Sequence, residues 1–534
     1  MDKVNSIAIV GGGSSGWMVA ATLINSFPEK DITLIESPNI STIGVGESTQ
    51  AKITQWAQSI GIDHKDFMQY TEASYKMSIK FTDFHEKGDG GFHYPFGRLY
   101  GGDAEFGAKD WHMKKTLYPE TPIQDYCNSF FPQMALVNKN KINENQYNIF
   151  NDYEFDKDTA FHFNATKFAF WLRDRYSIPR GVKHIKKEII EVKTDENGIS
   201  GLVLDDNSEF KADLYIDCTG FKALLIKETF NIPFEDISEY LPCNSAWAVQ
   251  IPYVDPEKEV ENFTNCTALS SGWVWNTPLY SRIGTGYVYS DKFISDEDAL
   301  LEFKEYLKNK KDPVYAPERI TEDLKFRNIK MRTGIHKKIW HKNMVAIGLS
   351  AGFIEPLESN GLYTVHEFIK ILVRSLDKGF VNQFDIDSFN HECRTIFYGF
   401  MKFVQMHYTL SKRRDSNFWK HMTSLEIDLE KPSGYNQVSS TRISYSYEYE
   451  TNSGIHCIAV GHNNLLFGNY AIKEFESQNS STNFELAAKG FIFRSDKSKE
   501  KWEKEAENSE NHYLYLKRNF HSDGEINEEQ KNKI

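Results

Sequence analysis

Hydrophobic and polar positions near the start of the chain predict a strand, a glycine turn, a helix and a second strand. Residues 7–10 (IAIV) form an apolar run that is typical of a buried parallel strand, and a glycine-rich segment follows it directly. Residues 17–24 are mostly apolar and predict a buried helix. A second apolar run at residues 32–35 (ITLI) ends in an acidic residue, Glu36. This order predicts an α/β fold in which helices cover a parallel sheet.

The glycine turn fits a dinucleotide-binding fingerprint. Its G-x-G-x-x-G pattern lets the backbone approach a pyrophosphate at a helix N-terminus, and an acid that ends the second strand is placed to bind a ribose hydroxyl. The residues predicted to contact the dinucleotide are Gly11, Gly13, Ser14, Ser15, Gly16 and Glu36. The alternative is a glycine-rich turn that binds nothing.

Later segments predict strands, a hairpin and a long helix. Residues 75–81 alternate strictly, which predicts a half-buried strand with Lys76 on a solvated face. Residues 90–97 (GGFHYPFG) predict an aromatic loop beside a pocket, and two short strands around Asn197-Gly198 predict a hairpin. Residues 214–220 and 344–348 predict strands that return to the first sheet, and a helix after Gly361 is expected to stop near Gly379.

Composition and charge exclude several classes of function. The chain of 534 residues is long enough for two or three lobes, and its formal net charge of −13 argues against a nucleic-acid partner. The six cysteines are scattered without metal-ligand spacing, so we expect reduced thiols and no metal site. The first strand begins too early for a signal peptide and no apolar run is long enough to span a bilayer, so we expect a cytoplasmic protein without a membrane anchor.

Several motifs together resemble the flavin-dependent halogenases of the tryptophan halogenase family. Residues 11–18 (GGGSSGWM) are similar to the opening motif of that family, and residues 44–49 (GVGEST) are similar to its flavin-strap loop. The pattern Trp273-x-Trp275-x-Thr277-Pro278 resembles the W-x-W-x-I-P signature that separates these halogenases from flavin hydroxylases. Residues 355–361 (EPLESNG) resemble E-P-L-E-S-T-G. The likeness covers residues 6–379. Within the family, the chain resembles a divergent, cyanophage-type member.

The resemblance implies a fold and a cofactor. It implies a Rossmann-like FAD-binding domain of the flavin monooxygenase type, with an inserted substrate lobe and a helical C-terminal region. We place the FAD-binding domain at residues 1–220 and 343–380, the substrate lobe at 221–342 and the C-terminal region, which would complete the substrate pocket, at 381–534. The further residues implied to contact FAD are Gly46, Glu47, Ser48, Ile189, Gly348 and Gly361.

The resemblance also implies the chemistry. The family's catalytic lysine and glutamate fall on Lys76 and Glu358, with Ser359 beside them, and a chloride, bromide or iodide ion is expected at the amides of Asn360 and Gly361. FADH2, dioxygen and halide would give hypohalous acid, which halogenates a small, electron-rich aromatic substrate. The implied pocket residues are Tyr94, Phe96, Trp273, Trp275 and Pro356. A separate NAD(P)H-dependent flavin reductase would supply the reduced flavin, and a homo-oligomer is compatible with the sequence.

Departures from the family pattern keep the substrate and two other function classes open. Asn360 replaces the usual Thr at the halide loop, which puts the halide preference in doubt, and Tyr94 stands where tryptophan-specific members carry His. The C-terminal third lacks the aromatic pattern that clamps free tryptophan, so we expect an indole-like or phenol-like substrate instead. The alternatives are a flavin-dependent aromatic hydroxylase, which would not need Lys76 and Glu358, and a flavin-fold protein that binds a ligand without turnover.

Overall fold

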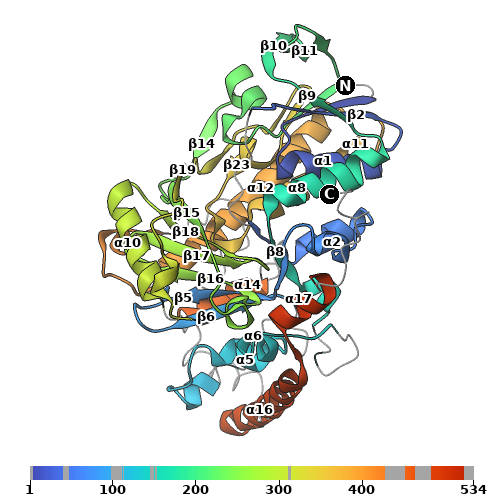
Figure 1. The fold of residues 1–534 in the computed structure, drawn as a ribbon. Coiled ribbons are helices and arrows are strands. Elements are labelled where there is room, and N and C mark those ends of the chain that lie inside the picture. The colour runs from blue at the N-terminus through green and yellow to red at the C-terminus, as the bar shows by residue number, and fades with distance from the viewer. Residues whose placement is uncertain are drawn as a thin grey trace.

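The computed structural model describes residues 4–39, 47–97, 111, 114–144, 150, 153–310, 314–426, 452–463 and 483–521. Figure 1 shows two main sheets, one near the top of the view beside the N-terminus and one at the lower left. Gly46 and the preceding residues of the predicted strap loop lie outside the described residues.

The sheet near the N-terminus is the predicted nucleotide-binding sheet. It has six strands in the order β21-β22-β13-β1-β2-β9, and every neighbouring pair is parallel except β21 with β22. The strands are β1 (Ser6–Val10), β2 (Asp31–Glu36), β9 (Lys183–Lys186), β13 (Leu214–Asp217), β21 (Trp340–His341) and β22 (Met344–Ala346). The apolar runs predicted as strands therefore lie side by side, and the predicted Rossmann-like α/β fold is confirmed.

Three helices pack together beside this sheet. They are α1 (Ser14–Ser26), α8 (Ala165–Trp171), which continues as a π-helical turn (Leu172–Ser177), and α11 (Gly361–Leu376). Figure 1 shows α1 and α11 close to β2 and the N-terminus, and α1 contacts both β1 and β2. The predicted helix after Gly361 is confirmed, and Gly379 follows it in the left-handed conformation at φ 79°.

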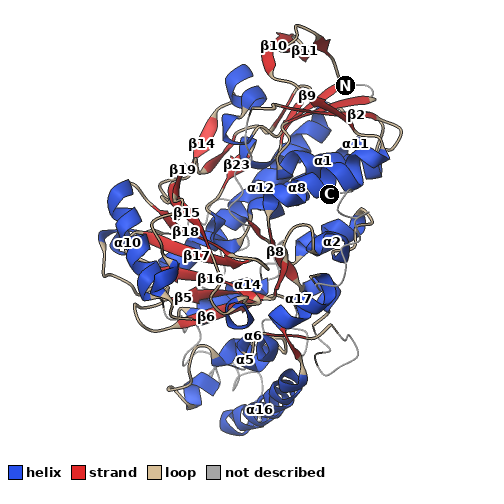
Figure 2. Ribbon diagram, in the orientation of Figure 1, coloured by secondary structure: helices blue, strands red, loops and turns tan. Residues whose placement is uncertain are grey.

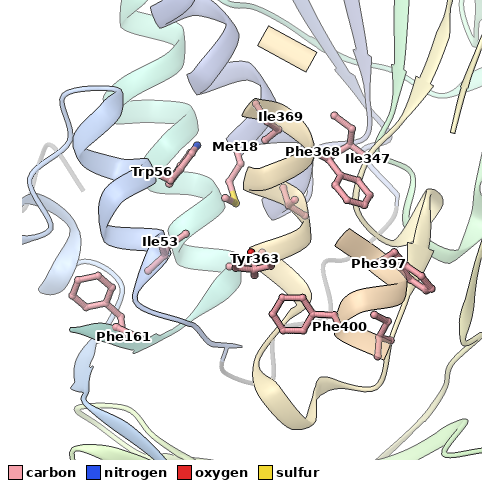
Figure 3. Close-up of a cluster of buried hydrophobic side chains, with 14 of the residues drawn as sticks. Met18, Ile53, Trp56, Phe161, Ile347, Tyr363, Phe368, Ile369, Phe397 and Phe400 are labelled. Carbon is pink, nitrogen blue, oxygen red and sulfur yellow. The ribbon is translucent and has the colours of Figure 1, made fainter. Parts of the chain in front are cut away.

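A buried cluster fixes α11 between its neighbours. Figure 3 shows Met18 of α1, Tyr363 of α11 and Phe400 of the long helix α12 (Gln383–Thr409) converging in it. The rings of Tyr363 and Phe400 lie 4.6 Å apart. On the other side, Trp56 of α2 (Lys52–Ser59) donates a hydrogen bond of 3.0 Å to the hydroxyl of Thr22. Because such cores are densely packed, the first turn of α11 has a fixed position.

The second sheet has seven strands in the order β19-β15-β18-β17-β16-β5-β6. Its strands are β5 (Ser78–Thr82), β6 (Gly91–Pro95), β15 (Ser245–Ile251), β16 (Phe263–Ala268), β17 (Gly272–Pro278), β18 (Ile283–Tyr289) and β19 (Arg327–Lys330). Helix α10 (Asp296–Asn309) packs on this sheet through a second cluster of buried side chains (Figure 2). The sheet joins strands of residues 78–95 to strands of residues 245–330, so hydrogen bonding crosses the boundary predicted at residue 220.

The predicted strand at residues 75–81 is two strands in two sheets. β4 (Ser74–Lys76) pairs with β8 (Ala160–Phe163), whereas β5 pairs with β16. Between them, the amide of Met77 donates to Asn262 O at 2.8 Å. The expected solvated lysine face is wrong, because neighbouring elements cover both sides and Lys76 is fully buried.

The aromatic loop predicted at residues 90–97 is also wrong in its conformation. Most of this segment is strand β6, which pairs antiparallel with β5 along its whole length. Its glycines and proline favoured a loop, but they stand at the two ends of the strand, where they interrupt no internal pairing.

A small three-stranded sheet joins the two parts. It has the order β3-β8-β4, with β3 (Glu47–Ser48) and β4 on either side of β8. In this sheet Ser48 lies opposite His162, and Lys76 lies opposite Ala160. The arrangement brings the residues after the strap loop next to Lys76, although they are far apart in the sequence.

The described C-terminal elements are mainly helices. After α12 come α13 (Asn417–Met422), α14 (Asn452–Gly461), α16 (Phe484–Asn508) and α17 (His512–Phe520). Helix α12 begins with a capping box in which Asn382 and Asp385 bond to each other's backbone amides. It packs on α11 and on α14, so the C-terminal region reaches the end of α11.

Shorter elements complete the described fold, and the hairpin predicted around Asn197-Gly198 is confirmed by the pairing of β10 with β11. They are α3 (Lys65–Met68), α5 (Asp125–Phe130), α6 (Met134–Asn138), β7 (Lys141–Ile142), α7 (Phe155–Asp158), β10 (Ile189–Asp195), β11 (Gly198–Leu204), β12 (Glu209–Phe210), β14 (Phe234–Asp236), α9 (Pro256–Glu259), β20 (Gly334–His336), β23 (Gly352–Phe353) and β24 (Glu510–Asn511).

Candidate active site

The glycine turn between β1 and α1 leaves space for a ligand at one position. A Cβ at Gly11, whose φ is +113°, would lie 2.4 Å from Cys218 O, and a Cβ at Gly16 would lie 1.9 Å from Gly11 O. These two glycines are therefore required by packing within the protein. A Cβ at Gly13 would meet no described atom within 4 Å, so the space beside Gly13 is open.

The N-terminus of α1 has neither a side-chain cap nor an acidic residue in its first turn. Gly13 is the N-cap residue and makes no side-chain cap hydrogen bond, and the first turn contains no acidic residue. Ser14 Oγ donates instead to Ala165 O at 3.1 Å. Ser15 Oγ lies beside Gly348, where a Cβ would be 2.4 Å away. The free amides and the helix dipole favour an anion at this end.

Glu36 lies against the same turn. Its Oε1 is 2.7 Å from Nε2 of His184, and its Oε2 would clash with a Cβ at Gly12. Lys186, which ends β9, pairs with Glu36, and Ile189 follows three residues later at the start of β10. The structure therefore places Glu36 at the turn, whereas Ile189 begins a strand of the separate sheet β10-β11-β12.

The buried Lys76 amine, at the end of β4, contacts two oxygen acceptors and one aromatic ring. Its Nζ donates to Thr49 O at 2.8 Å and to Ser359 Oγ at 2.9 Å, and it lies 4.9 Å from the centroid of the Phe96 ring. Burial lowers the pKa of Lys76 to about 7, against the attraction of Glu358 and other groups that raise it. Both the ammonium and the neutral amine are therefore present near neutral pH.

A tight turn before α11 carries the predicted residues Glu358, Ser359 and Asn360 and brings Ser359 next to this amine. A 3₁₀ turn (Pro356–Glu358) is followed by Ser359 in the left-handed conformation at φ 55°. Ser359 Oγ donates to Ser48 Oγ at 3.1 Å while it accepts from Lys76. The side chain of Asn360 donates to Glu355 O at 3.1 Å and makes no cap hydrogen bond to α11. The amides of the first turn of α11 are therefore free of a side-chain cap.

Glu47 lies next to the first residue of α11. A Cβ at Gly361 would be 3.3 Å from Oε1 of Glu47. Burial raises the pKa of Glu47 to about 7, and the charge of Lys76 opposes this rise. Glu47 is therefore partly protonated at neutral pH, which lessens its repulsion of an anion at Gly361.

Glu358 is held by a histidine of α12. Its Oε1 is 2.8 Å from Nε2 of His407, and both side chains are fully buried. The backbone carbonyl of Glu358 accepts from Nε2 of Gln50 at 2.7 Å. Oε2 of Glu358 has no hydrogen-bond partner in the described part of the chain. The hydrogen-bonding capacity of this oxygen is therefore unused within the described residues.

Only some of the predicted aromatic residues lie at the amine. Tyr94 and Phe96 are buried, with ring centroids 5.7 Å apart, and Phe96 faces Lys76. Trp273 and Trp275 lie on β17, which β16 separates from β5, and their rings are 6.4 Å apart. The structure therefore brings Tyr94 and Phe96 to the site and places the tryptophans farther along the sheet.

Other kinds of site are not found in the described residues. There, no group of His, Cys, Asp and Glu side chains could hold a metal ion. All six cysteines are free and buried. Across the described ranges, no helix is long and apolar enough to cross a membrane.

Comparisons with known proteins agree with this arrangement. The family model for tryptophan halogenase matches residues 6–460. This chain belongs to the tryptophan halogenase family. It is 33% identical over 442 residues to the tryptophan 6-halogenase ThaL of Streptomyces albogriseolus, which covers 80% of each chain. Among solved structures, apo VirX1 is similar with a TM-score of 0.85 and 34% identity over 96% of this chain and 99% of that one. The tryptophan 6-halogenase SttH of Streptomyces toxytricini has a TM-score of 0.81 and 28% identity over 96% and 99%.

As a tryptophan halogenase family member, the protein is a flavin-dependent halogenase, and its glycine turn fits the cofactor. The open space at Gly13 and the uncapped end of α1 suit a pyrophosphate, and the acid of Glu36 lies at the adjoining strand end. The family uses halide as well, and the uncapped first turn of α11 has the chemistry that an anion needs.

Two residues at this site, His407 and Thr49, were not predicted from the sequence. His407 holds Glu358, and Thr49 accepts from Lys76 through its backbone. His407 lies in a helix without a motif, and a lone histidine among apolar residues is usually read as part of a core. Thr49 acts through its carbonyl group, which the side-chain pattern does not reveal.

Proposed function

We propose that this halogenase transfers halogen to an electron-rich aromatic ring through Lys76, with Glu358 as the base. The observation that carries this proposal is the position of the Lys76 amine. It is fully buried, hydrogen-bonded to Ser359 and stacked over Phe96, with the Glu358 carboxylate next in the chain to Ser359.

Lys76 has two possible roles, and its pKa of about 7 suits both. The ammonium can donate a hydrogen bond to hypohalous acid and so draw electrons from the halogen. The neutral amine can attack the halogen, which forms an N–halogen bond and releases water. In either form, Thr49 O and Ser359 Oγ orient the nitrogen toward one direction.

Glu358 and Ser359 would act on the substrate ring. The ring carbon that gains halogen carries a positive charge in the arenium intermediate, and the unpaired Oε2 of Glu358 can stabilise this charge. The C–H bond then breaks, its electron pair returns to the ring, and the proton goes to Glu358. Ser359 would orient the oxygen of hypohalous acid beside Lys76.

We further propose the residues that hold cofactor and halide. Reduced FAD, when bound, supplies with dioxygen the oxidising power that turns halide into hypohalous acid. The residues proposed to contact it are Gly11, Gly13, Ser14, Ser15, Gly16, Glu36, Gly46, Glu47, Ser48, Ile189, Gly348 and Gly361. Asn360 and Gly361 would hold the halide through their backbone amides, and the side chain of Asn360 instead fixes the turn at Glu355.

The proposed substrate is an indole or phenol rather than free tryptophan. Tyr94 and Phe96 would face it, with Pro356 on the neighbouring turn and Trp273 and Trp275 as a barrier toward the flavin. ThaL is a tryptophan 6-halogenase, whereas this chain carries Tyr94 where the tryptophan-specific pattern has a histidine. Bromide and iodide are proposed as competitors of chloride because Asn360 changes the halide loop.

We also propose a flavin reductase as partner, the cytoplasm as location and three functional regions of the chain. No second nucleotide fingerprint is visible in the sequence, which supports a separate NAD(P)H-dependent flavin reductase. Six unpaired cysteines support a reducing, cytoplasmic compartment. Residues 1–220 and 343–380 would bind FAD, residues 221–342 would line the substrate side, and residues 381–534 would complete the pocket.

Product mass spectrometry tests the reaction class. The full chain is supplied with FAD, NADH, a flavin reductase, a panel of indoles and phenols, and chloride, bromide and iodide in parallel. We expect a mass gain of one halogen in place of one hydrogen. A gain of one oxygen would mean that the protein is a hydroxylase and would contradict the proposal.

A further inference from the structure

The hydrogen-bond partners of His407 determine which of its ring nitrogens carries a hydrogen. His407 Nδ1 lies 2.9 Å from the carbonyl oxygen of Phe403, and its Nε2 lies 2.8 Å from Oε1 of Glu358. A carbonyl oxygen can only accept a hydrogen bond, so Nδ1 must carry a hydrogen. In the opposite tautomer, the lone pair of Nδ1 would face this oxygen at hydrogen-bond distance.

The second contact then requires one more hydrogen. With Nδ1 protonated, a neutral imidazole presents a lone pair at Nε2. A lone pair and a carboxylate oxygen 2.8 Å apart repel each other, most strongly where both side chains are fully buried. A proton between Nε2 and Oε1 turns this repulsion into a charge-assisted hydrogen bond.

We propose that His407 and Glu358 share one proton between Nε2 and Oε1, which makes His407 a positioning residue for the base. The shared proton fixes Oε1 on the α12 side and leaves Oε2 as the oxygen that takes the ring proton. This inference rests on the proposed function of Glu358. The histidine touches neither substrate nor cofactor in the proposal and acts only through the carboxylate.

The proton balance of the step follows from this arrangement. Before the step, the pair holds one proton between Nε2 and Oε1. When the C–H bond of the substrate ring breaks, the electron pair returns to the ring and its proton binds to Oε2. The shared proton then rests on Nε2, so the pair holds two protons as a carboxylic acid and an imidazolium. Loss of one proton to water restores the starting state.

Among the described groups shown to face the pair, Lys76 is the one whose pKa lies near neutral pH. Burial raises the pKa values of Tyr94 of β6, Cys266 of β16 and Cys457 of α14, all of which face Glu358 and stay neutral. Burial lowers the pKa of His462, which faces His407 at the end of α14, so this ring is neutral too.

Apolar rings seal the histidine on its remaining sides. The rings of Phe81 of β5 and Phe403 of α12 lie 4.6 and 5.2 Å from the His407 ring. Among the described residues, Glu358 is the group in hydrogen-bonding contact with Nε2 of His407. The pair is therefore a closed unit of two groups and one proton.

Nitrogen NMR of the full chain, labelled with ¹⁵N-histidine, tests the shared proton without turnover. The His407 signals are assigned by their loss in His407→Gln. We expect Nδ1 to carry a hydrogen and Nε2 to be protonated or strongly hydrogen-bonded in the wild type. In Glu358→Gln we expect the neutral Nδ1–H ring. A neutral Nε2–H ring in the wild type, or identical spectra in both proteins, would overturn the proposal.

Kinetics of three variants test the positioning role. His407→Gln keeps a hydrogen-bond donor but cannot hold the extra proton, so we expect kcat for halogenation to fall about tenfold or more. The KM for the aromatic substrate should change little, and the pH dependence of kcat should change in shape. His407→Phe should be no more active. His391→Gln, on the exposed end of the same helix, is the matched control and should retain wild-type kinetics.

The outcomes separate the two claims. Wild-type kcat and an unchanged pH profile in His407→Gln would overturn the positioning role, because a merely structural histidine tolerates this replacement. Wild-type turnover in Glu358→Gln would overturn the proposed function of Glu358, whatever the spectrum of His407 shows.

Discussion

Burial of Lys76 should make the stability of the protein depend on pH in a specific way. The pKa of Lys76 falls from 10.5 to about 7 on folding, chiefly because burial disfavours the charged amine. Between these two values the unfolded chain binds more protons than the folded one. The free energy of unfolding therefore rises with pH over this window, and the Lys76→Met variant lacks this rise.

The magnitude follows from the two pKa values. Each pH unit within the window is worth up to about 1.4 kcal/mol. From about pH 6 to about pH 9, part of the interval lies below the folded pKa, so the expected gain of the wild type relative to Lys76→Met is about 2.5 kcal/mol. At the acidic end the variant should be more stable by several kcal/mol, since a buried ammonium is costly.

Urea unfolding followed by tryptophan fluorescence measures this difference. Wild type and Lys76→Met are compared at several pH values without flavin. The pair is then repeated in a Glu47→Gln background, which removes the neighbouring carboxyl whose pKa is also about 7. The difference should persist there, because burial is its main cause. Parallel pH dependences of the two proteins from pH 6 to 9 would refute the reasoning.

Three further predictions concern the ligands and the ring contacts. Gly13→Val should fold normally, since a Cβ at Gly13 meets no described atom within 4 Å. The variant should nevertheless bind FAD about tenfold or more weakly in a fluorescence titration. Unchanged affinity would contradict the placement of the pyrophosphate. Glu47 should lose its proton as pH rises through about 7, and its negative charge should then repel the halide. The KM for halide should therefore increase between about pH 6 and pH 8.5 in the wild type and change less in Glu47→Gln. An equal change of KM with pH in both proteins would show that Glu47 does not face the halide. Phe96→Leu removes a cation–π contact that favours the ammonium form of Lys76 by about 1 kcal/mol. The kinetic pKa assigned to Lys76 should therefore fall by somewhat less than one unit in a pH–rate profile. A rise in this pKa would contradict the contact.

The nucleotide-binding part of the fold could be predicted from the sequence because its signals are local. Apolar runs such as residues 7–10 and 32–35 are typical of parallel strands that are buried on both faces, and the glycine turn needs specific residues at Gly11 and Gly16. The order of these elements then leaves few topologies.

The surroundings of Lys76 could not be predicted because they depend on contacts distant in sequence. The alternation at residues 75–81 indicates a strand, but it does not tell which elements cover the second face. That face is closed by β8, the turn at Ser359 and the backbone of Thr49. Residues 90–97 likewise carry loop-forming glycines, and only the pairing with β5 makes them a strand.

Motifs imply the proposed roles of Lys76 and Glu358, whereas His407 lies in no motif. Its contact with Glu358 depends on the packing of α12 on α11, to which side chains such as Tyr363 and Phe400 contribute (Figure 3). A sequence pattern shows that such a helix has a buried face, but not which buried residue meets a reactive carboxylate.

The most direct test of the central claim compares halogen transfer in the wild type and in Lys76→Ala. Both proteins are given reduced flavin, dioxygen, bromide and an indole, and halogenated product is measured per flavin oxidised, with free hypohalous acid trapped by an added scavenger. We predict that the wild type yields halogenated indole, while Lys76→Ala binds flavin normally, loses the product by about a hundredfold or more, and releases oxidant to the scavenger. Equal product formation by Lys76→Ala would contradict the account.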